Sequence, residues 1–462
     1  MRTILKSLAG AAPLALALLL TAGEARAQTP ARNILLIIAD DFGVDAARFY
    51  PTAADRRATT PPAPPTPNLT ALASKGVLFR RAWTTPWCSP TRASLLTGRY
   101  PFRTGVGAPI PTPTTPGVTQ DPELALDEFS LPEAFQAARP GRYLLAHVGK
   151  WHVSIGEDDP NLQGWSYFAG PRPDLAKLDS YYRWPKTVNG VTTTSTTYAT
   201  TDQVNEAVRK IGEAKAQARP YLIWLAFSAP HSPYQKPPNG LHSRDSLPAT
   251  GAPRRAYYDA MVEAMDTEIG RLLRSVDLAT TTVIFVGDNG TPAEVTASPY
   301  DPRHAKGTPY EGGVRVPLLV AGAGVTAPGR IVERIVNGVD LYPTILELAG
   351  IDPAAAVPSG TRIDGVSILP YLQNQVGTPL RTFVYAEEFP DHRFDRLFER
   401  AIANCCYKLI EREVGSREFY DLRADPYETR NLLTTTLTTT QRSNLNTLDS
   451  RLDALIATAP SP

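Results

Sequence analysis

The chain has 462 residues, 42% of them hydrophobic, and its 47 basic and 46 acidic side chains leave a formal net charge of +1. This length suits one large domain together with a smaller one. The balanced charge excludes a general electrostatic attraction to nucleic acid or to an anionic membrane surface, so any anion must be bound by a local cluster of basic side chains.

The first 27 residues have the pattern of a secretory signal peptide. Arg2 and Lys6 precede an apolar run over residues 14–20, and the Ala-Arg-Ala sequence at 25–27 fits a small-residue cleavage site. The alternative, a retained membrane anchor, is disfavoured because the run is shorter than the roughly 20 apolar residues that span a bilayer. No later segment approaches that length. We therefore expect a secreted or periplasmic protein without a membrane span.

Apolar runs and helix-like segments alternate along residues 28–374. The apolar runs have the pattern of strands buried on both faces of a parallel sheet, and they cover 33–39, 143–148, 221–227 and 282–286. The helix-like segments cover 202–218 and 257–276. This alternation predicts an α/β domain with a large mixed, mostly parallel sheet flanked by helices.

Polar residues follow each of the four predicted strands. In chain order they are Asp40 and Asp41, Lys150 and His152, His231, and Asp288 and Asn289. Ligands of such sheets bind outside the carboxyl ends of the strands. The four groups are therefore predicted to form one shared site.

Part of this polar group offers only hard oxygen ligands. These residues are Asp40, Asp41, Asp288 and Asn289. Such ligands suit Ca²⁺ or Mg²⁺ rather than zinc. Asp40 and Asp41 alone would fit a strand-end turn or a helix cap, but a second acidic-amide pair after another buried strand favours one divalent cation.

Residues 375–462 are predicted to form a smaller C-terminal subdomain. Strand-like pieces at 383–389, 401–411 and 418–422 precede an amphipathic segment at 441–456. This order predicts a small antiparallel sheet with a terminal helix.

The chain has three cysteines, too few for a disulfide framework in an exported protein. The adjacent Cys405 and Cys406 could form a vicinal disulfide or remain two thiols on opposite faces of a strand, and we favour the strand. Cys88 then has no obvious partner, which suits a modified residue.

Cys88 opens a run of thirteen residues, Cys-Ser-Pro-Thr-Arg-Ala-Ser-Leu-Leu-Thr-Gly-Arg-Tyr. Pro90 suits the first turn of a short helix that residues 93–96 continue. A helix N-terminus favours anions, and Arg92 close behind strengthens that preference. A small buried cysteine at a helix start is the alternative, but the proline, the arginine and the Leu-Leu-Thr-Gly-Arg continuation favour a functional site.

This run resembles the signature of type I sulfatases, in which the cysteine is oxidised after synthesis to formylglycine, an aldehyde whose hydrate is the nucleophile. Over residues 33–432 the chain is similar to this family, which belongs to the alkaline phosphatase superfamily. Further matching blocks are Gly-Lys-Trp-His at 149–152, Ala-Pro-His-Ser-Pro at 229–233, Gly-Asp-Asn-Gly at 287–290, Lys306 with Tyr-Glu-Gly-Gly at 310–313, and Phe-Tyr-Asp-Leu at 419–422 with Asp-Pro at 425–426.

The resemblance implies one bound cation per chain, Ca²⁺ in preference to Mg²⁺ or Mn²⁺. Its ligands would be Asp40, Asp41, Asp288, Asn289 and the formylglycine made from Cys88. The resemblance also implies that a formylglycine-generating enzyme acts on the chain during maturation.

The resemblance also assigns roles to the basic residues. Arg92 would orient the aldehyde hydrate, and Lys150 with Lys306 would hold sulfate oxygens. His231 with Lys306 would protonate the leaving alcohol, which leaves a sulfo-enzyme intermediate. His152 would take a proton from the second hydroxyl, so that sulfate departs and the aldehyde is restored.

The implied activity is arylsulfatase-like hydrolysis of a sulfate monoester to an alcohol and inorganic sulfate. Two alternatives remain: a phosphonate monoester or phosphodiester hydrolase on the same scaffold, and an inactive protein that binds sulfated glycans because Cys88 is unmodified. The loops near the site carry no readable code for the organic group. Aryl, glycan and steroid sulfates therefore all remain open as substrates.

Overall fold

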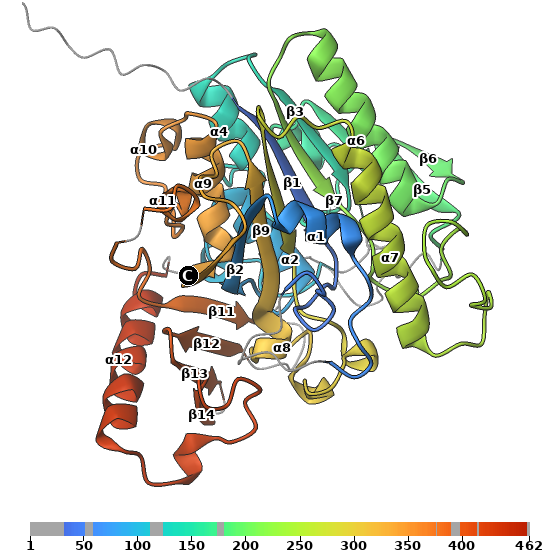
Figure 1. Ribbon diagram of the computed structural model, residues 1–462. Helices are drawn as coiled ribbons and strands as arrows, with labels where there is room; N and C mark the ends of the chain where they lie inside the picture. Colours follow the sequence, from blue (N-terminus) through green and yellow to red (C-terminus); the bar gives the residue numbers. More distant parts are fainter. Residues whose placement is uncertain are drawn as a thin grey trace, which may run out of the picture.

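The computed structural model describes residues 32–50, 59–110, 123–172, 180–375, 377–389, 398–413 and 415–459. These residues form a large sheet flanked by helices and a second, smaller sheet with its own helix (Figure 1). The predicted signal peptide lies outside the described residues, and the boundary at 374/375 stays a prediction.

The large sheet has ten strands in the order β10-β2-β9-β8-β1-β7-β3-β4-β5-β6. In chain order they are β1 Asn33–Ala39, β2 Gly76–Trp83, β3 Leu144–Gly149, β4 Tyr167–Gly170, β5 Trp184–Val188, β6 Val191–Ser195, β7 Tyr221–Ala226, β8 Thr281–Gly287, β9 Arg315–Gly322 and β10 Arg330–Asn337. The four central strands, β8, β1, β7 and β3, are all parallel, whereas β9 pairs antiparallel with both β8 and β2. The mixed, mostly parallel sheet is thus confirmed.

The four predicted strands are β1, β3, β7 and β8, each within one residue of its expected ends. Strands β2 and β9 are not predicted from the sequence, and their composition explains why. β2 contains Arg80 and Arg81, and β9 contains Pro317, which argues against a central strand. Pro317 is accommodated where the register between β2 and β9 shifts.

Helices cover both faces of the large sheet (Figure 1). The helices are α1 Pro67–Ala73, α2 Cys88–Thr97, α3 Pro101–Thr104, α4 Leu131–Ala138, α5 Asp159–Leu162, α6 Ala199–Ala216, α7 Arg254–Leu273, α8 Glu311–Val314, α9 Leu341–Leu348, α10 Pro353–Ala356, α11 Leu369–Leu372 and α12 Thr439–Ile456. Alternate side chains of a strand point to opposite faces, so Ile34 and Leu36 pack with α2, α4 and α9 while Leu35 and Ile37 pack with α1, α6 and α7. No helix in these parts of the chain is long and apolar enough to cross a membrane.

The smaller sheet is antiparallel, in the order β11-β12-β13-β14, and contains β11 Val384–Glu388, β12 Glu399–Ala403, β13 Tyr407–Arg412 and β14 Arg417–Asp421. Helix α12 packs Leu448, Leu452 and Leu455 against one face of it. This confirms the predicted antiparallel sheet with a terminal helix.

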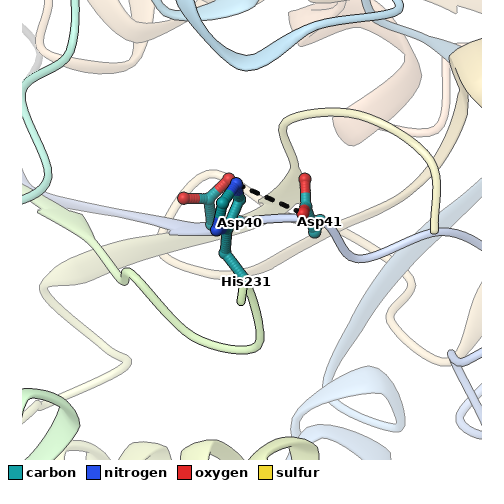
Figure 2. A group of neighbouring side chains, drawn as sticks. All are labelled: Asp40, Asp41 and His231. Atoms are coloured by element: carbon teal, nitrogen blue, oxygen red, sulfur yellow. Dashed lines mark ion pairs between the residues drawn. The ribbon is translucent and has the colours of Figure 1, made fainter. Parts of the chain in front are cut away.

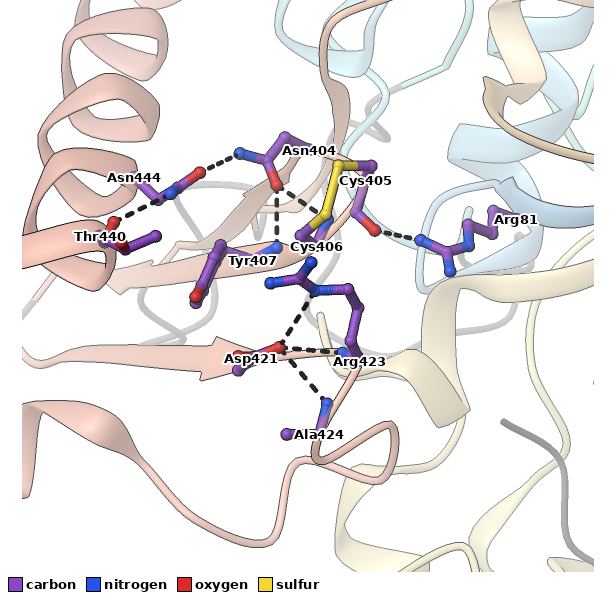
Figure 3. Close-up of a disulfide and its surroundings, with 10 residues drawn as sticks. All are labelled: Arg81, Asn404, Cys405, Cys406, Tyr407, Asp421, Arg423, Ala424, Thr440 and Asn444. Atoms are coloured by element: carbon purple, nitrogen blue, oxygen red, sulfur yellow. Dashed lines mark hydrogen bonds and ion pairs between the residues drawn. A yellow bond between two sulfur atoms is a disulfide. The ribbon is translucent and has the colours of Figure 1, made fainter. Parts of the chain in front are cut away.

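The expected single strand over 401–411 is wrong, because a turn at 404–406 separates β12 from β13. The Asn404 side chain accepts the N–H groups of Cys406 at 2.9 Å and Tyr407 at 2.8 Å, which fixes this turn. Cys405 and Cys406 lie in the turn and form a disulfide (Figure 3). The favoured expectation of two thiols on a strand is therefore also wrong.

Candidate active site

The parallel central strands bring the four predicted polar groups to one edge of the sheet. The order β8-β1-β7-β3 places the residues after these strands side by side. Asp40, Asp288, Asn289 and Lys150 are fully buried there, and Asp41 is 2% exposed. The sheet topology therefore accounts for the gathering of residues that lie up to about 250 positions apart in the chain.

Two of the site residues have a backbone conformation that is unusual for side-chain-bearing residues. Asp41 has φ 62° and His152 has φ 55°, and such left-handed conformations persist where the surroundings hold them. The Asp41 N–H donates to Asp288 Oδ1 at 3.0 Å, and the Asp41 carbonyl accepts from the Tyr258 hydroxyl at 2.9 Å. These contacts aim the Asp41 side chain into the site.

Three carboxylates pair with three basic groups at this edge. Lys150 Nζ lies 2.6 Å from Asp40 Oδ2, Arg92 NH2 lies 2.7 Å from Asp288 Oδ2, and Lys306 contacts Asp41. Burial and the neighbouring Asp40 carboxylate raise the pKa of Asp288. Burial opposes the charged form of Lys306, but Asp41, Cys88 and Asp40 together outweigh it and raise the pKa of the lysine.

The amide of Asn289 presents an oxygen that suits a cation. Its Nδ2 donates to Asp41 Oδ1 at 2.8 Å and to the Gly290 carbonyl at 2.9 Å. The buried Oδ1 accepts no hydrogen bond from the described residues. A buried oxygen without a donor is costly, so this atom and the adjacent carboxylates fit a bound divalent cation.

Ligand atoms of Asp40, Asp41 and His231 all lie within 4.8 Å of one another (Figure 2). His231 Nδ1–H donates to the Ser232 carbonyl at 2.7 Å, so Nε2 faces Asp41 Oδ2 at 3.5 Å. His231 is expected in the site from the sequence, but its place beside both aspartates is not. It comes close because the loop after β7 lies next to the loop after β1.

Cys88 begins α2 and is 1% exposed. Its Sγ lies 3.2 Å from His152 Nδ1. The other ring nitrogen, Nε2, donates to the Ile110 carbonyl at 3.1 Å, which leaves the lone pair of a neutral imidazole on the nitrogen that faces Cys88. Burial raises the pKa of the Cys88 thiol to about 11, although Lys150 and Lys306 oppose this shift.

Arg92 lies behind Cys88 on the same helix and connects two of the strand-end groups. Its guanidinium donates to Asp288 Oδ2 through Nε at 3.2 Å and NH2 at 2.7 Å, and to the Lys150 carbonyl at 2.8 Å. The carboxylates, Asn289 and the cations Arg92, Lys150 and Lys306 form one network that His231 adjoins, and the Cys88–His152 pair lies beside it on the helix of Arg92.

Three residues that support the site are not predicted from the sequence. Tyr258 holds the Asp41 backbone from α7, and Ile110 holds the His152 ring. Trp87 lies beside the Lys306 ammonium, which is 5.6 Å from the centre of its ring. Only Trp87 could be found from the sequence, because it directly precedes Cys88. Tyr258 and Ile110 lie in distant segments and belong to no motif.

A cavity of about 630 Å³ lies between residues 301–310 and the smaller sheet. It is next to Lys306 in the chain but outside the buried network. Its lining is polar and aromatic, and includes Arg303, Tyr310, Arg412 and Tyr420.

Comparisons with known proteins agree with this arrangement. A family model described as Sulfatase matches residues 32–351, and one described as N-sulphoglucosamine sulphohydrolase, C-terminal, matches residues 300–457. Arylsulfatase A of Bos taurus is 30% identical over 419 residues, which cover 81% of this chain and 74% of the relative. N-acetylgalactosamine-6-sulfatase of Sus scrofa is 30% identical over 368 residues, which cover 73% of this chain and 65% of the relative.

Solved structures share the fold. The crystal structure of Ps i-CgsB superposes with a TM-score of 0.75 at 24% identity and covers 92% of each chain. The PsFucS1 sulfatase from Pseudoalteromonas sp. superposes with a TM-score of 0.71 at 24% identity, over 94% of this chain and 92% of that chain. With these matches and the buried site in place, the chain belongs to the sulfatase family of sulfuric ester hydrolases.

Proposed function

We propose that this sulfatase cleaves a sulfate monoester with a formylglycine made from Cys88 as its nucleophile. The supporting observation is the 3.2 Å contact between Cys88 Sγ and His152 Nδ1, in the field of Lys150 and Lys306. With its pKa raised to about 11, an unmodified Cys88 would hold little thiolate at neutral pH and attack slowly. An aldehyde hydrate would replace this inert thiol by hydroxyl groups at the same position.

We propose Ca²⁺ as the cation, held by oxygen atoms of Asp40, Asp41, Asp288 and Asn289. When bound, it would supply positive charge to the sulfate oxygens and favour ionisation of the attacking hydroxyl. The three carboxylates and the three basic groups cancel in charge, so a bound dication would leave the site with two positive charges. The two added positive charges would then be matched by a sulfate monoester anion and one ionised hydroxyl.

The basic residues bind and orient in this proposal. Lys150 and Lys306 hold sulfate oxygens, and because Lys150 is fully buried and the Lys306 side chain is only 10% exposed, little water competes with such contacts. Arg92 orients the nucleophile from behind, with its guanidinium fixed by Asp288 and by the Lys150 carbonyl.

The two histidines move protons in opposite directions. His231 Nε2 faces the Asp41 carboxylate, and His231 together with Lys306 donates a proton to the leaving alcohol. His152 Nδ1 accepts a proton from the second hydroxyl, since its Nε2 is already engaged with Ile110. Each positioned proton transfer contributes about 10²- to 10⁴-fold to the rate.

We propose a sulfated sugar as the substrate class. The cavity beside residues 301–310 has hydrogen-bonding side chains suited to sugar hydroxyls rather than to an apolar steroid. Ps i-CgsB is also solved in complex with k-i-k-neocarrahexaose, and a further neighbour, with a TM-score of 0.69 at 18% identity, is solved with its substrate D-glucosamine-2-N,6-O-disulfate.

We propose that residues 1–27 direct export to the periplasm or beyond, and that a formylglycine-generating enzyme modifies Cys88 before the chain folds. Cys88 is 1% exposed in the folded chain, so a modifying enzyme could not reach it afterwards. We therefore expect the secreted protein to have lost this leader and to carry a Cys88 that was modified before the chain folded.

Turnover tests the proposal on protein made together with a formylglycine-generating enzyme. The substrates are 4-nitrophenyl sulfate, a phenyl phosphonate monoester and bis(4-nitrophenyl) phosphate, each assayed after chelation and after return of Ca²⁺. We expect sulfate ester turnover that needs Ca²⁺ and that Cys88→Ala abolishes. A higher kcat/KM for either phosphorus ester would overturn the sulfatase assignment of this site, and restoration by Zn²⁺ rather than Ca²⁺ would argue for a nitrogen ligand such as His231.

A further inference from the structure

A second buried ionic cluster lies away from the catalytic edge, between the smaller sheet and α8. Lys408 of β13 is fully buried, and its Nζ lies 2.8 Å from Glu428 Oε1 and 3.4 Å from Glu311 Oε1. Glu428 and Glu311 are 2% and 5% exposed. Buried charges are costly unless they are paired, so this cluster strongly constrains the three segments that carry it.

The cluster binds the start of α8 through both the backbone and the side chain of Glu311. The Glu311 N–H donates to Glu428 Oε2 at 2.5 Å, while the Glu311 carboxylate faces Lys408. Glu428 has a left-handed backbone with φ 55°, an uncommon conformation that turns its side chain towards α8. The Lys408 ammonium also lies 4.5 Å from the centre of the Trp83 ring, at the end of β2.

Helix α8 in turn contacts three of the segments that carry site residues: those of Asn289, Cys88 and Lys306. The Gly313 carbonyl accepts the Gly290 N–H at 2.8 Å, next to Asn289, and the Val314 carbonyl accepts the Thr84 N–H at 2.9 Å, four residues before Cys88. A Cβ at Gly313 would lie 2.1 Å from the Thr308 carbonyl oxygen. The backbone of α8 therefore packs directly on the loop that bears Lys306.

The Lys306 loop is also tied to these same segments. The Lys306 N–H donates to the Thr291 carbonyl at 3.1 Å, and the Gly307 N–H donates to the Pro86 carbonyl at 3.0 Å. A shift of α8 would thus be transmitted to Lys306, to Asn289 and to the start of α2.

We propose that Lys408 and Glu428 are positioning residues through which the smaller sheet holds Lys306 in its catalytic place. This rests on the proposed function, because it takes Lys306 as a group that touches the sulfate ester. Neither Lys408 nor Glu428 contacts the reacting atoms, so their effect on turnover is exerted through α8 and the loop that follows residue 304.

A double-mutant cycle tests this role with Lys408→Met and Lys306→Ala. We expect Lys408→Met to lower kcat on the order of 10- to 100-fold, because small misplacements of catalytic groups cost that much. In the Lys306→Ala background the same change should lower kcat by a clearly smaller factor, since Lys306 is gone and only the contacts of α8 with the segments of Asn289 and Cys88 remain. Arg400→Met is the matched control, because it also removes a cation from the smaller sheet. The partner of Arg400 is Glu411, at 2.9 Å, which is distant from α8 in the chain.

Two outcomes would overturn the proposal: wild-type kcat in Lys408→Met, or a loss of the same size with and without Lys306. The Lys306→Ala result on its own reports on the proposed function, so the two failures are distinguishable. If Lys408→Met does not fold, Glu428→Gln carries the same cycle, because a glutamine retains an oxygen that can accept the Glu311 N–H. Lys408→Met/Glu428→Gln should recover part of the lost kcat, since of the two carboxylates that faced Lys408 only Glu311 then stays charged, and Arg315 NH1 lies 3.9 Å from it.

Discussion

The two sheets of this protein distribute their charged residues differently. At the carboxyl edge of the large sheet the ionic side chains are at most about a tenth exposed and converge on one point. On the smaller sheet the pairs Arg400–Glu411 and Arg412–Glu399 join neighbouring strands in register, and their side chains are 17–26% exposed. The first arrangement concentrates charge, whereas the second spreads it over a face.

Strand direction explains this difference. Parallel strands end at the same edge, so whatever follows them meets there. Antiparallel strands end at alternate edges, and their charged residues pair across the strands instead. Catalytic chemistry is therefore expected at the edge of the large sheet, and support from the smaller sheet, whose fully buried Lys408 contacts Glu311 of α8.

Asn289→Leu is expected to have the largest effect, because it removes a buried oxygen that we assign to the cation while keeping the number and branching of the side-chain heavy atoms. We expect Ca²⁺ affinity, measured by titration calorimetry, to fall on the order of 100-fold or more. Turnover should fall with it and recover partly at high Ca²⁺. Unchanged calcium binding would contradict the assigned ligand set.

His231→Gln should distinguish the leaving-group side of the site. A good leaving group such as 4-nitrophenol needs little protonation, whereas a sugar alcohol needs a general acid. We expect kcat to fall about 10²-fold or more for a sulfated sugar and clearly less for 4-nitrophenyl sulfate. Equal losses on both substrates would assign His231 to cation or substrate binding rather than to proton donation.

Glu387→Gln probes the contact between the smaller sheet and α3. Burial raises the pKa of Glu387 to about 7, and its carboxyl accepts the Phe102 N–H at 2.8 Å and the Tyr385 hydroxyl at 2.9 Å. A raised carboxyl pKa contributes stability that is fully present below the unfolded value of about 4.3 and is lost as the pH rises through about 7. The melting temperature of the wild type should therefore fall relative to that of the variant, by a few °C, between pH of about 5 and about 8. A difference that is constant with pH would contradict this.

Cys405→Ser/Cys406→Ser is expected to have the smallest effect. The disulfide closes the shortest possible loop, so it restricts the unfolded chain little. Its turn is fixed independently by Asn404, and the Cys405 carbonyl also accepts a hydrogen bond from Arg81. We expect a melting temperature within about 2 °C of the wild type and unchanged turnover. A marked loss of turnover would show that the turn supports the catalytic edge.

The sequence predicts the catalytic edge better than the surroundings that hold it. Buried parallel strands are recognisable in the sequence as apolar runs. The candidate site residues follow these runs directly, as Asp40 follows β1 and Asp288 follows β8. The turn at 404–406 is not predictable from the pattern, because a single side chain, that of Asn404, fixes it. The residues on both sides of Asn404 are strand-forming, so the segment has the pattern of one strand. Tyr258 and Lys408 act over more than 90 positions of sequence and belong to no motif, so only the folded chain shows what they contact.

The central claim is that Cys88 becomes formylglycine and is then the nucleophile. Intact mass of the tryptic peptide 82–92, from protein made with and without a formylglycine-generating enzyme, tests it most directly. We predict a loss of about 18 Da relative to the thiol, from replacement of CH₂SH by CHO, in proportion to the turnover of 4-nitrophenyl sulfate by each sample. Full turnover in protein whose Cys88 remains an unmodified thiol would contradict it.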